Sequence, residues 1–380
     1  MKKWPTVPLG EVLRYRKDFT IIDDTQQYKR CRVQLHAKGV VLRDLTSGAD
    51  IKTKRQQVCR TGDFLVAEID AKMGGFGLVP ESLNGAVVSS HYFLFESDDT
   101  CLDKRYLDHY CHARRFRNQV EAQGSTNYAA IRPVDVLNYS IPLPSLAEQQ
   151  ALVARLDALA EKTRQVEAHL DAVERDAEHL LALRFRDAIA GAPLRALAEV
   201  APAVRRSVEI DITQHYREIG ARSFGKGLFV KPDFDGAEAT WQKPVWIKAG
   251  DLVLSNIKAW EGAIAIAGQE HEGCIASHRY ITCTPDTTIS IIGFLAYYLL
   301  SEEGLEKVGF ASPGTADRNR TLNLTNLGKI SVPIPPLSIQ RTFEQLQAEI
   351  AALKAKHAAI RAANAALLPA TLERVFAETA

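Results

Sequence analysis

The sequence predicts an α+β protein built from two copies of one unit, each a globular domain followed by a long helix. Two stretches carry apolar residues in alternating steps of three and four, which is typical of a coiled-coil seam. The peptide SIPLPSLAEQ at 140–149 recurs as SVPIPPLSIQ at 331–340, directly before the second seam. The two long helices are therefore expected to pair with each other as an antiparallel coiled coil.

The first long helix is expected within 141–189. Pro142 and Pro144 mark its entry, and Pro193 after Gly191 marks its end, since proline does not fit inside a helix. Its seam positions are Leu156, Leu159, Thr163, Val166, Leu170, Val173, Ala177 and Leu180.

The second long helix is expected after the repeated corner peptide. Its seam positions are Phe343, Leu346, Ile350, Leu353, His357, Ile360, Asn364 and Leu367. Because the two seams belong to repeated halves and each lacks a partner, antiparallel pairing is the natural arrangement. Thr163, His357 and Asn364 are polar seam residues, which are either imperfections or residues that fix the register of the pair.

An internal repeat covers the whole chain. Residues 9–12 (LGEV) match 197–200 (LAEV) at an offset of 188, and 62–66 (GDFLV) match 250–254 (GDLVL) at the same offset. Such self-similarity indicates a duplicated structural unit. We divide the chain into a first domain, a first helix, a second domain and a second helix, at 1–145, 146–190, 191–336 and 337–380.

Within each domain, short runs rich in valine, isoleucine and aromatic residues are expected to be strands. These runs are 63–69, 86–95, 251–257 and 273–283. Residues 105–121 and 291–308 are expected to be helices that lead into loops containing Gly124 and Gly314.

The composition is that of an ordinary globular protein, with 46% hydrophobic and 24% charged residues among 380. The start, MKKWPTVPLG, lacks the apolar core of a signal peptide, and no apolar run is long enough for a membrane span. The six cysteines form no CxxC pair, which argues against zinc. We expect a cytoplasmic protein with free thiols.

The charge is nearly balanced, at a formal +1. Residues 1–145 carry 21 basic and 17 acidic residues, and no segment has the large basic surplus that would by itself indicate nucleic-acid binding. Binding to DNA would therefore require clustered charge or help from a partner.

The sequence matches none of the catalytic motifs considered below. Residues 220–227 (GARSFGKG) approach a P-loop, but Gly227 stands where serine or threonine should reach magnesium. The glycine-rich segment 74–77 is better explained as a turn, and no Asn-Pro-Pro-aromatic tetrad for amine methylation is present. His91 and His278 recur at equivalent places, either as ligand contacts or as structural histidines. A duplicated enzyme should show a duplicated catalytic constellation, so these patterns favour a binding protein.

The corner IPLPSLAEQQALVARLDAL, its repeat VPIPPLSIQRTFEQL, and the variable domain before each corner resemble the specificity subunit of type I restriction-modification enzymes. The resemblance covers the whole chain. Ile339 replaces the glutamate found at Glu148, so the two corners need not share one helix cap.

The resemblance implies two target-recognition domains, each reading half of a split, asymmetric sequence in double-stranded DNA. The paired helices would set the spacing and dock two methyltransferase subunits. S-adenosylmethionine would then belong to those subunits, and ATP-driven translocation and cleavage to restriction subunits, leaving this chain without a cofactor, a metal or a catalytic site.

DNA contacts are expected from loops rich in hydroxyl, amide and guanidinium groups, with GTADRNR at 314–320 the strongest loop. The candidates in the first domain are Lys72, Ser90, His91, Tyr92, Ser125, Thr126, Asn127 and Tyr128. Those in the second domain are Lys258, Trp260, His278, Arg279, Thr315, Arg318, Asn319 and Arg320, although Trp260 could instead be a core aromatic.

Two other functions remain open at this stage. The chain could be a scaffold whose domains bind protein, which salt-dependent duplex binding would distinguish. It could also be an enzyme with an unrecognised site, in which case nucleotide binding should depend on Lys226. The two domains share a frame but differ in most loop residues, which suits two different half-sites better than one symmetric ligand.

Overall fold

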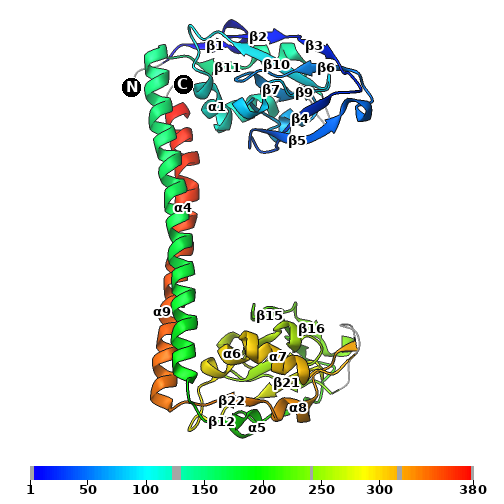
Figure 1. Ribbon diagram of the computed structural model, residues 1–380, viewed down its shortest axis with the longest axis vertical. Helices are drawn as coiled ribbons and strands as arrows, with labels where there is room; N and C mark the ends of the chain where they lie inside the picture. Colours follow the sequence, from blue (N-terminus) through cyan, green and yellow to red (C-terminus); the bar gives the residue numbers. More distant parts are fainter. Residues whose placement is uncertain (1–3, 122–129, 240–242, 315–318, 378–380) are drawn as a thin grey trace. The chain divides into compact units, whose positions relative to one another are not determined.

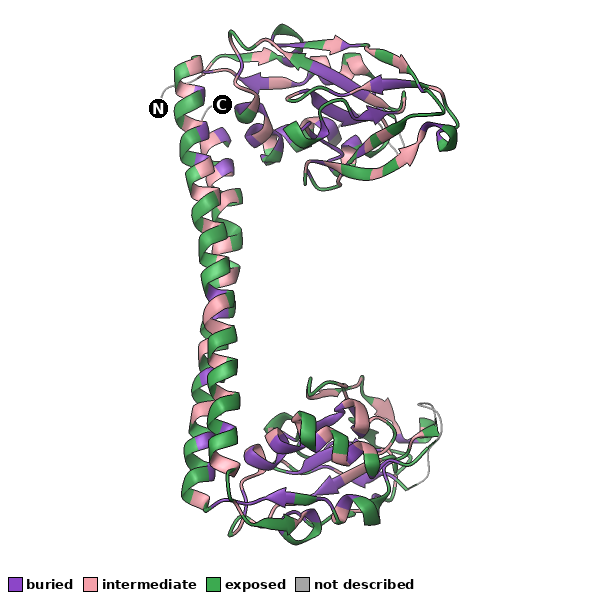
Figure 2. Ribbon diagram, in the orientation of Figure 1, coloured by how far each residue is buried: buried purple, intermediate pink, exposed green. Residues whose placement is uncertain are grey.

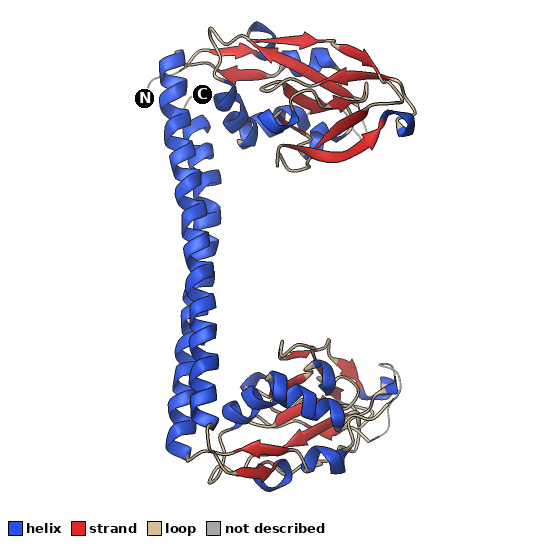
Figure 3. Ribbon diagram, viewed as in Figure 1, coloured by secondary structure: helices blue, strands red, loops and turns tan. Residues whose placement is uncertain are grey.

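The computed structural model describes residues 4–121, 130–239, 243–314 and 319–377. The chain forms two compact units. Unit 1 comprises Met1–Asp171 and His357–Ala380, and unit 2 comprises Ala172–Lys356. Each unit contains one mixed domain and a stretch of both long helices (Figure 3), which confirms the α+β class and the duplication.

In unit 1, two sheets form the body of the domain. The order of the four-stranded sheet is β2 (Leu13–Arg16), β10 (Tyr92–Ser97), β7 (Phe64–Ala67) and β8 (Phe76–Leu78). The order of the five-stranded sheet is β3 (Phe19–Ile21), β6 (Arg55–Val58), β9 (Val87–Val88), β4 (Gln27–Val33) and β5 (Val40–Ser47). The central strand β7 is buried along its whole length (Figure 2) because all four of its residues are apolar.

The helices and the closing strands of unit 1 complete this domain. The helices are α1 (Lys104–His112), α2 (Arg114–Glu121) and α3 (Pro133–Asn138), and strand β1 (Thr6–Pro8) pairs with β11 (Ser140–Pro142). The single helix expected at 105–121 is two helices, because Ala113 between them has an extended backbone.

In unit 2, the main sheet has the order β19 (Ile264–Ile266), β18 (Leu252–Ser255) and β21 (Tyr280–Cys283). The strand pairs are β12 (Leu194–Ala196) with β22 (Ser331–Pro333), β13 (His215–Tyr216) with β16 (Phe234–Asp235), β14 (Ile219–Ala221) with β15 (Leu228–Val230), and β17 (Val245–Trp246) with β20 (Ile275–Ala276).

The helices of the second domain are α5 (Leu197–Val200), α6 (Ile292–Leu300), α7 (Glu302–Phe310) and α8 (Leu324–Gly328). The helix expected at 291–308 is again two helices. Ser301 has an extended backbone, and its hydroxyl accepts a hydrogen bond from the Gly304 N–H. It therefore ends α6 and caps α7, as serine commonly does at a helix start.

The long helices α4 (Leu146–Ile189) and α9 (Leu337–Ala377) run antiparallel within each unit (Figure 1). In unit 1, Arg361 Nε lies 3.3 Å from Glu167 Oε2, and Asn364 Nδ2 lies 2.9 Å from the Thr163 carbonyl oxygen. In unit 2, Lys354 Nζ lies 2.6 Å from Glu178 Oε1. Residue numbers in α9 fall along these contacts as those in α4 rise, so the predicted antiparallel pairing is confirmed.

The buried seam follows the predicted positions only in part. Leu156, Leu170, Phe343, Ile350 and His357 are buried as expected. The exceptions are Val166, Leu180, Ile360 and Leu367, which are 37%, 43%, 45% and 46% exposed. Near the C-terminal end of each long helix the buried residues depart from the predicted seam. Phe185 of α4 and Leu372 and Phe376 of α9 are buried there. There the helix packs on a globular domain, which requires the 3.6-residue stripe instead of the coiled-coil repeat.

The corner that enters each long helix is held by a fully buried glutamine. Gln149 accepts a hydrogen bond from the Asp103 N–H at 2.8 Å and donates to the carbonyls of Cys101 and Pro144. Gln340 does the same in unit 2 with Ile291, Ile289 and Pro335. These bonds tie the helix start to the segment preceding α1 or α6.

At the corner of α4, Glu148 Oε2 accepts from the Ser145 N–H and hydroxyl, and the Glu148 N–H donates to the Ser145 hydroxyl, which is a capping box. Pro336 and Ile339 stand at these positions in the second corner. The cap bonds of Ser145 and Glu148 side chains therefore have no chemical equivalent there.

The far end of each long helix contributes an aromatic residue to a domain core. Phe185 of α4 packs in unit 2 against Phe294 and Tyr297, with ring centroids 5.0 and 4.7 Å apart. Phe376 of α9 packs in unit 1 against Tyr106 and Tyr110, at 5.6 and 5.0 Å. Each domain is thus completed by a helix that begins at the other domain.

Candidate nucleic-acid interface

The same backbone framework organises the loops at one end of the central strand in each domain. In unit 1, β7 leads into the 3₁₀ turn η3 (Asp70–Met73). The Glu68 N–H donates to the His91 carbonyl at 2.8 Å, and the Ile131 N–H donates to the Glu68 carbonyl at 3.0 Å. Three separate loops therefore meet at Glu68.

The framework recurs in unit 2, where β18 leads into the 3₁₀ turn η6 (Ala259–Glu261). The Asn256 N–H donates to the Arg279 carbonyl at 2.7 Å, and the Leu322 N–H donates to the Asn256 carbonyl at 2.7 Å. Asn256 therefore has the role of Glu68, at the repeat offset of 188. The backbone is shared, while the side chain changes from an acid to an amide.

Three of the first-domain candidates surround this junction. Lys72 lies on η3, and Ser90 and His91 are exposed in the loop before β10. His91 Nδ1 lies 2.6 Å from Glu68 Oε2. The pair places an imidazole ring and a carboxylate on the same surface. Both groups can hydrogen-bond to base edges, and the carboxylate would repel a phosphate.

Tyr92 has a more structural position than its neighbours. It is half-buried at the start of β10 and packs against the core around Leu94. Burial is the main cause that raises the pKa of its hydroxyl. The ring of Tyr92 therefore supports the loop that carries Ser90 and His91.

In the second domain, Trp260 lies between two cations. Lys258 Nζ is 5.1 Å from the centre of a Trp260 ring, and the Arg320 guanidinium carbon is 4.7 Å away. Such contacts are favourable because the ring face carries negative charge. The indole N–H donates to the Ile257 carbonyl at 3.1 Å, so Trp260 is a half-buried platform on the turn and not a core residue.

Arg320 is tied to the end of α7. Its Nη2 donates to the Gly309 carbonyl at 2.9 Å, so the guanidinium satisfies a helix C-terminus while stacking on Trp260. This geometry makes Arg320 a positioning residue for the loop. Asn319 beside it is exposed, as are His278 and Arg279 in the loop before β21.

Lys258 is held by Glu261, whose Oε1 is 2.7 Å from its Nζ. This hydrogen bond is the main cause that lowers the pKa of the Glu261 carboxyl. The turn therefore combines a lysine, a stacked tryptophan and a fixed carboxylate in four residues.

Six further candidates lie outside the described residues: Ser125, Thr126, Asn127 and Tyr128 in the first domain, and Thr315 and Arg318 in the second. Ile131 and Leu322, which follow these two segments in the chain, are hydrogen-bonded into the two junctions.

Each junction also includes a hairpin tip, whose residues are not among the predicted DNA contacts. Residues 36–39 (HAKG) and 224–227 (FGKG) lie at the repeat offset of 188 and share a Lys-Gly pair. The second tip connects antiparallel strands β14 and β15, whereas a P-loop joins a strand to a helix. The near-match to a P-loop therefore has no structural basis.

No cluster of three or more His, Cys, Asp or Glu side chains suited to a metal ion occurs within 4–121, 130–239, 243–314 and 319–377. Over the same ranges, no helix combines the length and the apolar character that crossing a membrane requires.

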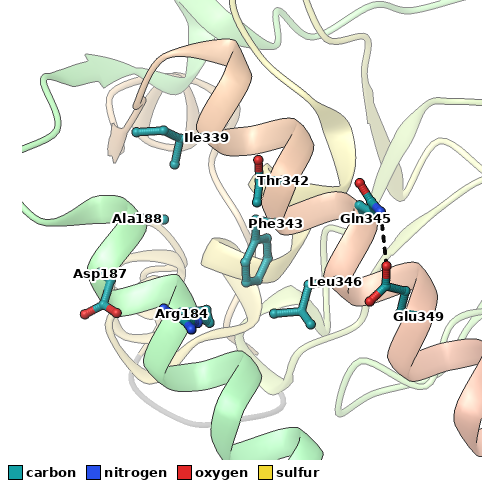
Figure 4. Close-up of a pocket in the computed structure, with 9 residues that line it drawn as sticks. All are labelled: Arg184, Asp187, Ala188, Ile339, Thr342, Phe343, Gln345, Leu346 and Glu349. Carbon is teal, nitrogen blue, oxygen red and sulfur yellow. Dashed lines mark hydrogen bonds between the residues drawn. The ribbon is translucent and has the colours of Figure 1, made fainter.

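A groove lies between the start of α9 and the end of α4 in unit 2 (Figure 4). Its volume is about 590 Å³. Phe343 and Leu346 form its floor, Ile339 is 41% exposed, and Gln345 is hydrogen-bonded to Glu349 at 3.1 Å on its rim. Arg184 and Asp187 of α4 line the opposite side. This is an apolar groove with a charged rim, typical of a surface that takes a protein partner.

Comparisons with known proteins agree with this architecture. The family model of the type I restriction modification DNA specificity domain matches residues 1–175. The type I restriction enzyme StySPI specificity subunit of Salmonella potsdam is 23% identical over 282 residues, which span 65% of this chain and 59% of that relative.

Two solved structures share the fold. The HsdS subunit from Thermoanaerobacter tengcongensis has a TM-score of 0.64 at 22% identity, with 100% of this chain and 97% of that chain covered. A chain from a study of complex assembly and conformational transition of the type I R-M system has a TM-score of 0.72 at 22% identity, with 98% and 97% covered.

The duplicated domain and the paired long helices are the features that this chain shares with these two structures. Residues 1–175 are thus similar to the type I restriction modification DNA specificity domain, and the chain as a whole shares the fold of the two solved structures.

Proposed function

We propose that this chain is the non-catalytic DNA-binding subunit of a cytoplasmic type I restriction-modification complex. Each domain reads one half of a split, asymmetric target in double-stranded DNA. The observation that carries the proposal is the framework at Glu68 and Asn256, which repeats in backbone hydrogen bonds but not in side chains. A duplicated reader of two different half-sites requires this combination, because base edges are distinguished by the side chains that reach them.

The candidate side chains differ in chemistry at matched positions. Lys72 on η3 corresponds to Trp260 on η6 at the offset of 188, and Glu68 corresponds to Asn256. An asparagine amide can pair with adenine and a carboxylate with cytosine, whereas a lysine reaches guanine or phosphate. The two domains therefore offer different sets of donors and acceptors for two different half-sites.

The paired helices would set the distance between the half-sites. DNA presents the same groove face every ~34 Å, so two readers joined by helices of fixed length accept only one spacing. Sequence choice would then depend on the domains and spacing on α4 and α9. This division follows from the separate positions of the junction residues and the helix seam in the chain.

Two methyltransferase subunits would bind the helices, and the groove beside Phe343 and Leu346 is our candidate surface for one of them. S-adenosylmethionine and the methylated adenine would be handled by those subunits, and ATP by restriction subunits. The balanced charge of the chain supports this scheme, because partners that close around DNA can supply the phosphate contacts that a charge of +1 does not.

The proposal is tested by co-expressing the chain with a methyltransferase subunit from the same genome and mapping N6-methyladenine by single-molecule sequencing. A split, asymmetric motif that requires both chains supports it. Exchange of residues 191–336 for the second domain of another family member should then change one half of the motif and leave the other intact. An assembled complex that adds no methylation would instead favour a scaffold whose domains bind protein.

A further inference from the structure

The hairpin tips at 36–39 and 224–227 are built into the two junctions by matched hydrogen bonds. In unit 1, the His36 and Ala37 N–H groups donate to the carbonyls of Met73 and Gly74 at 2.7 and 2.9 Å. In unit 2, the Phe224 and Gly225 N–H groups donate to the carbonyls of Glu261 and Gly262, both at 2.8 Å. Each tip is therefore fixed to the same 3₁₀ turn that carries Lys72 or Trp260.

Glycine at the end of each turn permits this close approach. Gly74 and Gly262 have φ of 77° and 80°. A Cβ on Gly74 would lie 2.6 Å from the Ala37 nitrogen, and one on Gly262 would lie 3.3 Å from the Phe224 Cα. The tip and the turn therefore form one rigid surface in each domain.

Phe224 is held in an unusual state at the tip of the second hairpin. Its backbone is left-handed, with φ 63°, and its side chain is 75% exposed. A left-handed conformation is costly for a bulky residue and persists only where the surroundings enforce it, often at a functional site. The hydrogen bonds to η6 enforce it here and direct an aromatic side chain into solvent.

A cation lies beside this ring, and a second lies on a neighbouring aromatic ring. Lys226 Nζ lies 5.7 Å from the Phe224 ring centre, and Lys226 is itself exposed. The Arg222 guanidinium carbon, directly after β14, lies 4.6 Å from the ring centre of Phe229 in β15. An exposed aromatic among lysine and arginine is the combination that proteins use to contact bases while binding the phosphates beside them.

We propose that the tip of the second hairpin is a further DNA-contacting element, in which Phe224 makes an apolar contact with a base and Lys226 binds a neighbouring phosphate. This inference rests on the proposed function and extends it to residues outside the candidate set. The matched tip of the first domain presents His36 at the position of Phe224 and Lys38 at that of Lys226. The phosphate contact is thus common to both domains, while the base contact differs.

A protein occupant is the alternative. Phe224 and Gly225 also border a hollow lined by Leu181 and Phe185 of α4 and by Leu300 of α6. DNA is favoured as the occupant for two reasons. The residue that both tips share is a lysine, and the second tip is fixed to the turn that bears Lys258 and Trp260. A docking surface for a common partner subunit would keep the apolar residue, yet the first domain has a histidine there.

The test uses the complex with its methyltransferase subunit. The variants are Phe224→Ala and Phe224→Asn, the latter because asparagine tolerates a left-handed backbone. Ile212→Ala is the control, since Ile212 is a 69% exposed apolar residue of the same domain that does not belong to the tip at 224–227. Thermal unfolding of each complex establishes that the variants are folded.

Both Phe224 variants are expected to weaken binding to the cognate duplex by about 10-fold and to relax one base position in the half-site of the second domain. Lys226→Ala should weaken binding to every duplex and lower the salt slope by about one unit. Ile212→Ala should change neither property.

The proposal is overturned if Phe224 variants keep the affinity and the motif of the Ile212 control. It is also overturned if they prevent assembly with the methyltransferase, which would assign Phe224 to a protein contact. Absence of a split motif in the wild-type complex would be a failure of the proposed function itself, before any tip variant is compared.

Discussion

The side-chain amide of Asn364 in α9 donates a hydrogen bond of 2.9 Å to the main-chain carbonyl of Thr163 in α4. The same amide donates to Glu167 Oε1 at 2.8 Å. Two residues that the sequence marks as polar exceptions in opposite seams are therefore direct neighbours. A polar residue at one seam position fixes register at a cost in stability.

Replacing Asn364 by leucine should therefore stabilise the helix pair, by about 1 kcal/mol in the free energy of unfolding. Unfolding in guanidinium chloride measures the change, with Ala365→Leu on the exposed side of α9 as the control. A loss of stability in Asn364→Leu would show that its hydrogen bonds outweigh apolar burial at this position.

The glutamines of the two corners should be among the most sensitive polar residues. Gln149→Leu would leave the Asp103 N–H and the Cys101 and Pro144 carbonyls without their buried partner. Since an unsatisfied buried group costs ~1–3 kcal/mol, a loss of about 3 kcal/mol is expected, and Gln340→Leu should behave alike. Chemical unfolding provides the measurement. Gln345 lies on the exposed rim of the groove, so Gln345→Leu should change the free energy of unfolding little. An equal loss of stability in all three variants would contradict the role assigned to the corner glutamines.

Acid should destabilise a repeated pair of turns. Thr100 and Thr288 hydrogen-bond to Asp98 and Asp286, and these bonds lower the pKa of both carboxyls. A folded-state pKa below the unfolded value of ~3.9 contributes stability above that pH, which is lost as the pH falls through the folded value.

Thr288→Ala removes the largest cause of the shift at Asp286. The variant should therefore lose less stability than the wild type between neutral pH and pH values below ~3.9, as followed by urea unfolding at each pH. Parallel curves for the two proteins would exclude this contribution.

Lengthening both helices should change the spacer alone. Insertion of 21 residues, or three heptads, after Asp171 and after Lys356 keeps the seam and adds about 32 Å, close to the ~34 Å over which DNA presents the same groove face again. Methylome mapping should then show the same half-sites with a longer gap. Altered half-sites with the original gap would contradict the separation of reading from spacing.

The sequence was sufficient for the repeat, the helices and their pairing because these depend on local periodicity. The sequence did not predict which residues are buried where one helix packs first on the other long helix and then on a globular domain. Leu180 fits the 3.5-residue pattern but is exposed, since α4 turns its apolar face toward the second domain near Phe185.

The candidate interface shows a similar limit. Lys72 and Trp260 could be selected from residue type, but the capping role of Arg320 depends on Gly309 eleven residues away. The tip at Phe224 was missed because its exposure and its left-handed backbone are set by bonds to Glu261, thirty-seven positions later. The Lys-Gly pair that recurs at 38–39 and 226–227 was the available signal in the sequence.

The aromatic contacts of Phe376 have a consequence for synthesis of the chain. Tyr106 and Tyr110 are made well before Phe376, the residue that covers them. A domain whose first strands emerge from the ribosome at the outset must keep part of its core open until α9 has followed it out. A chain that stops short of Phe376 would therefore present these tyrosines to proteases and chaperones.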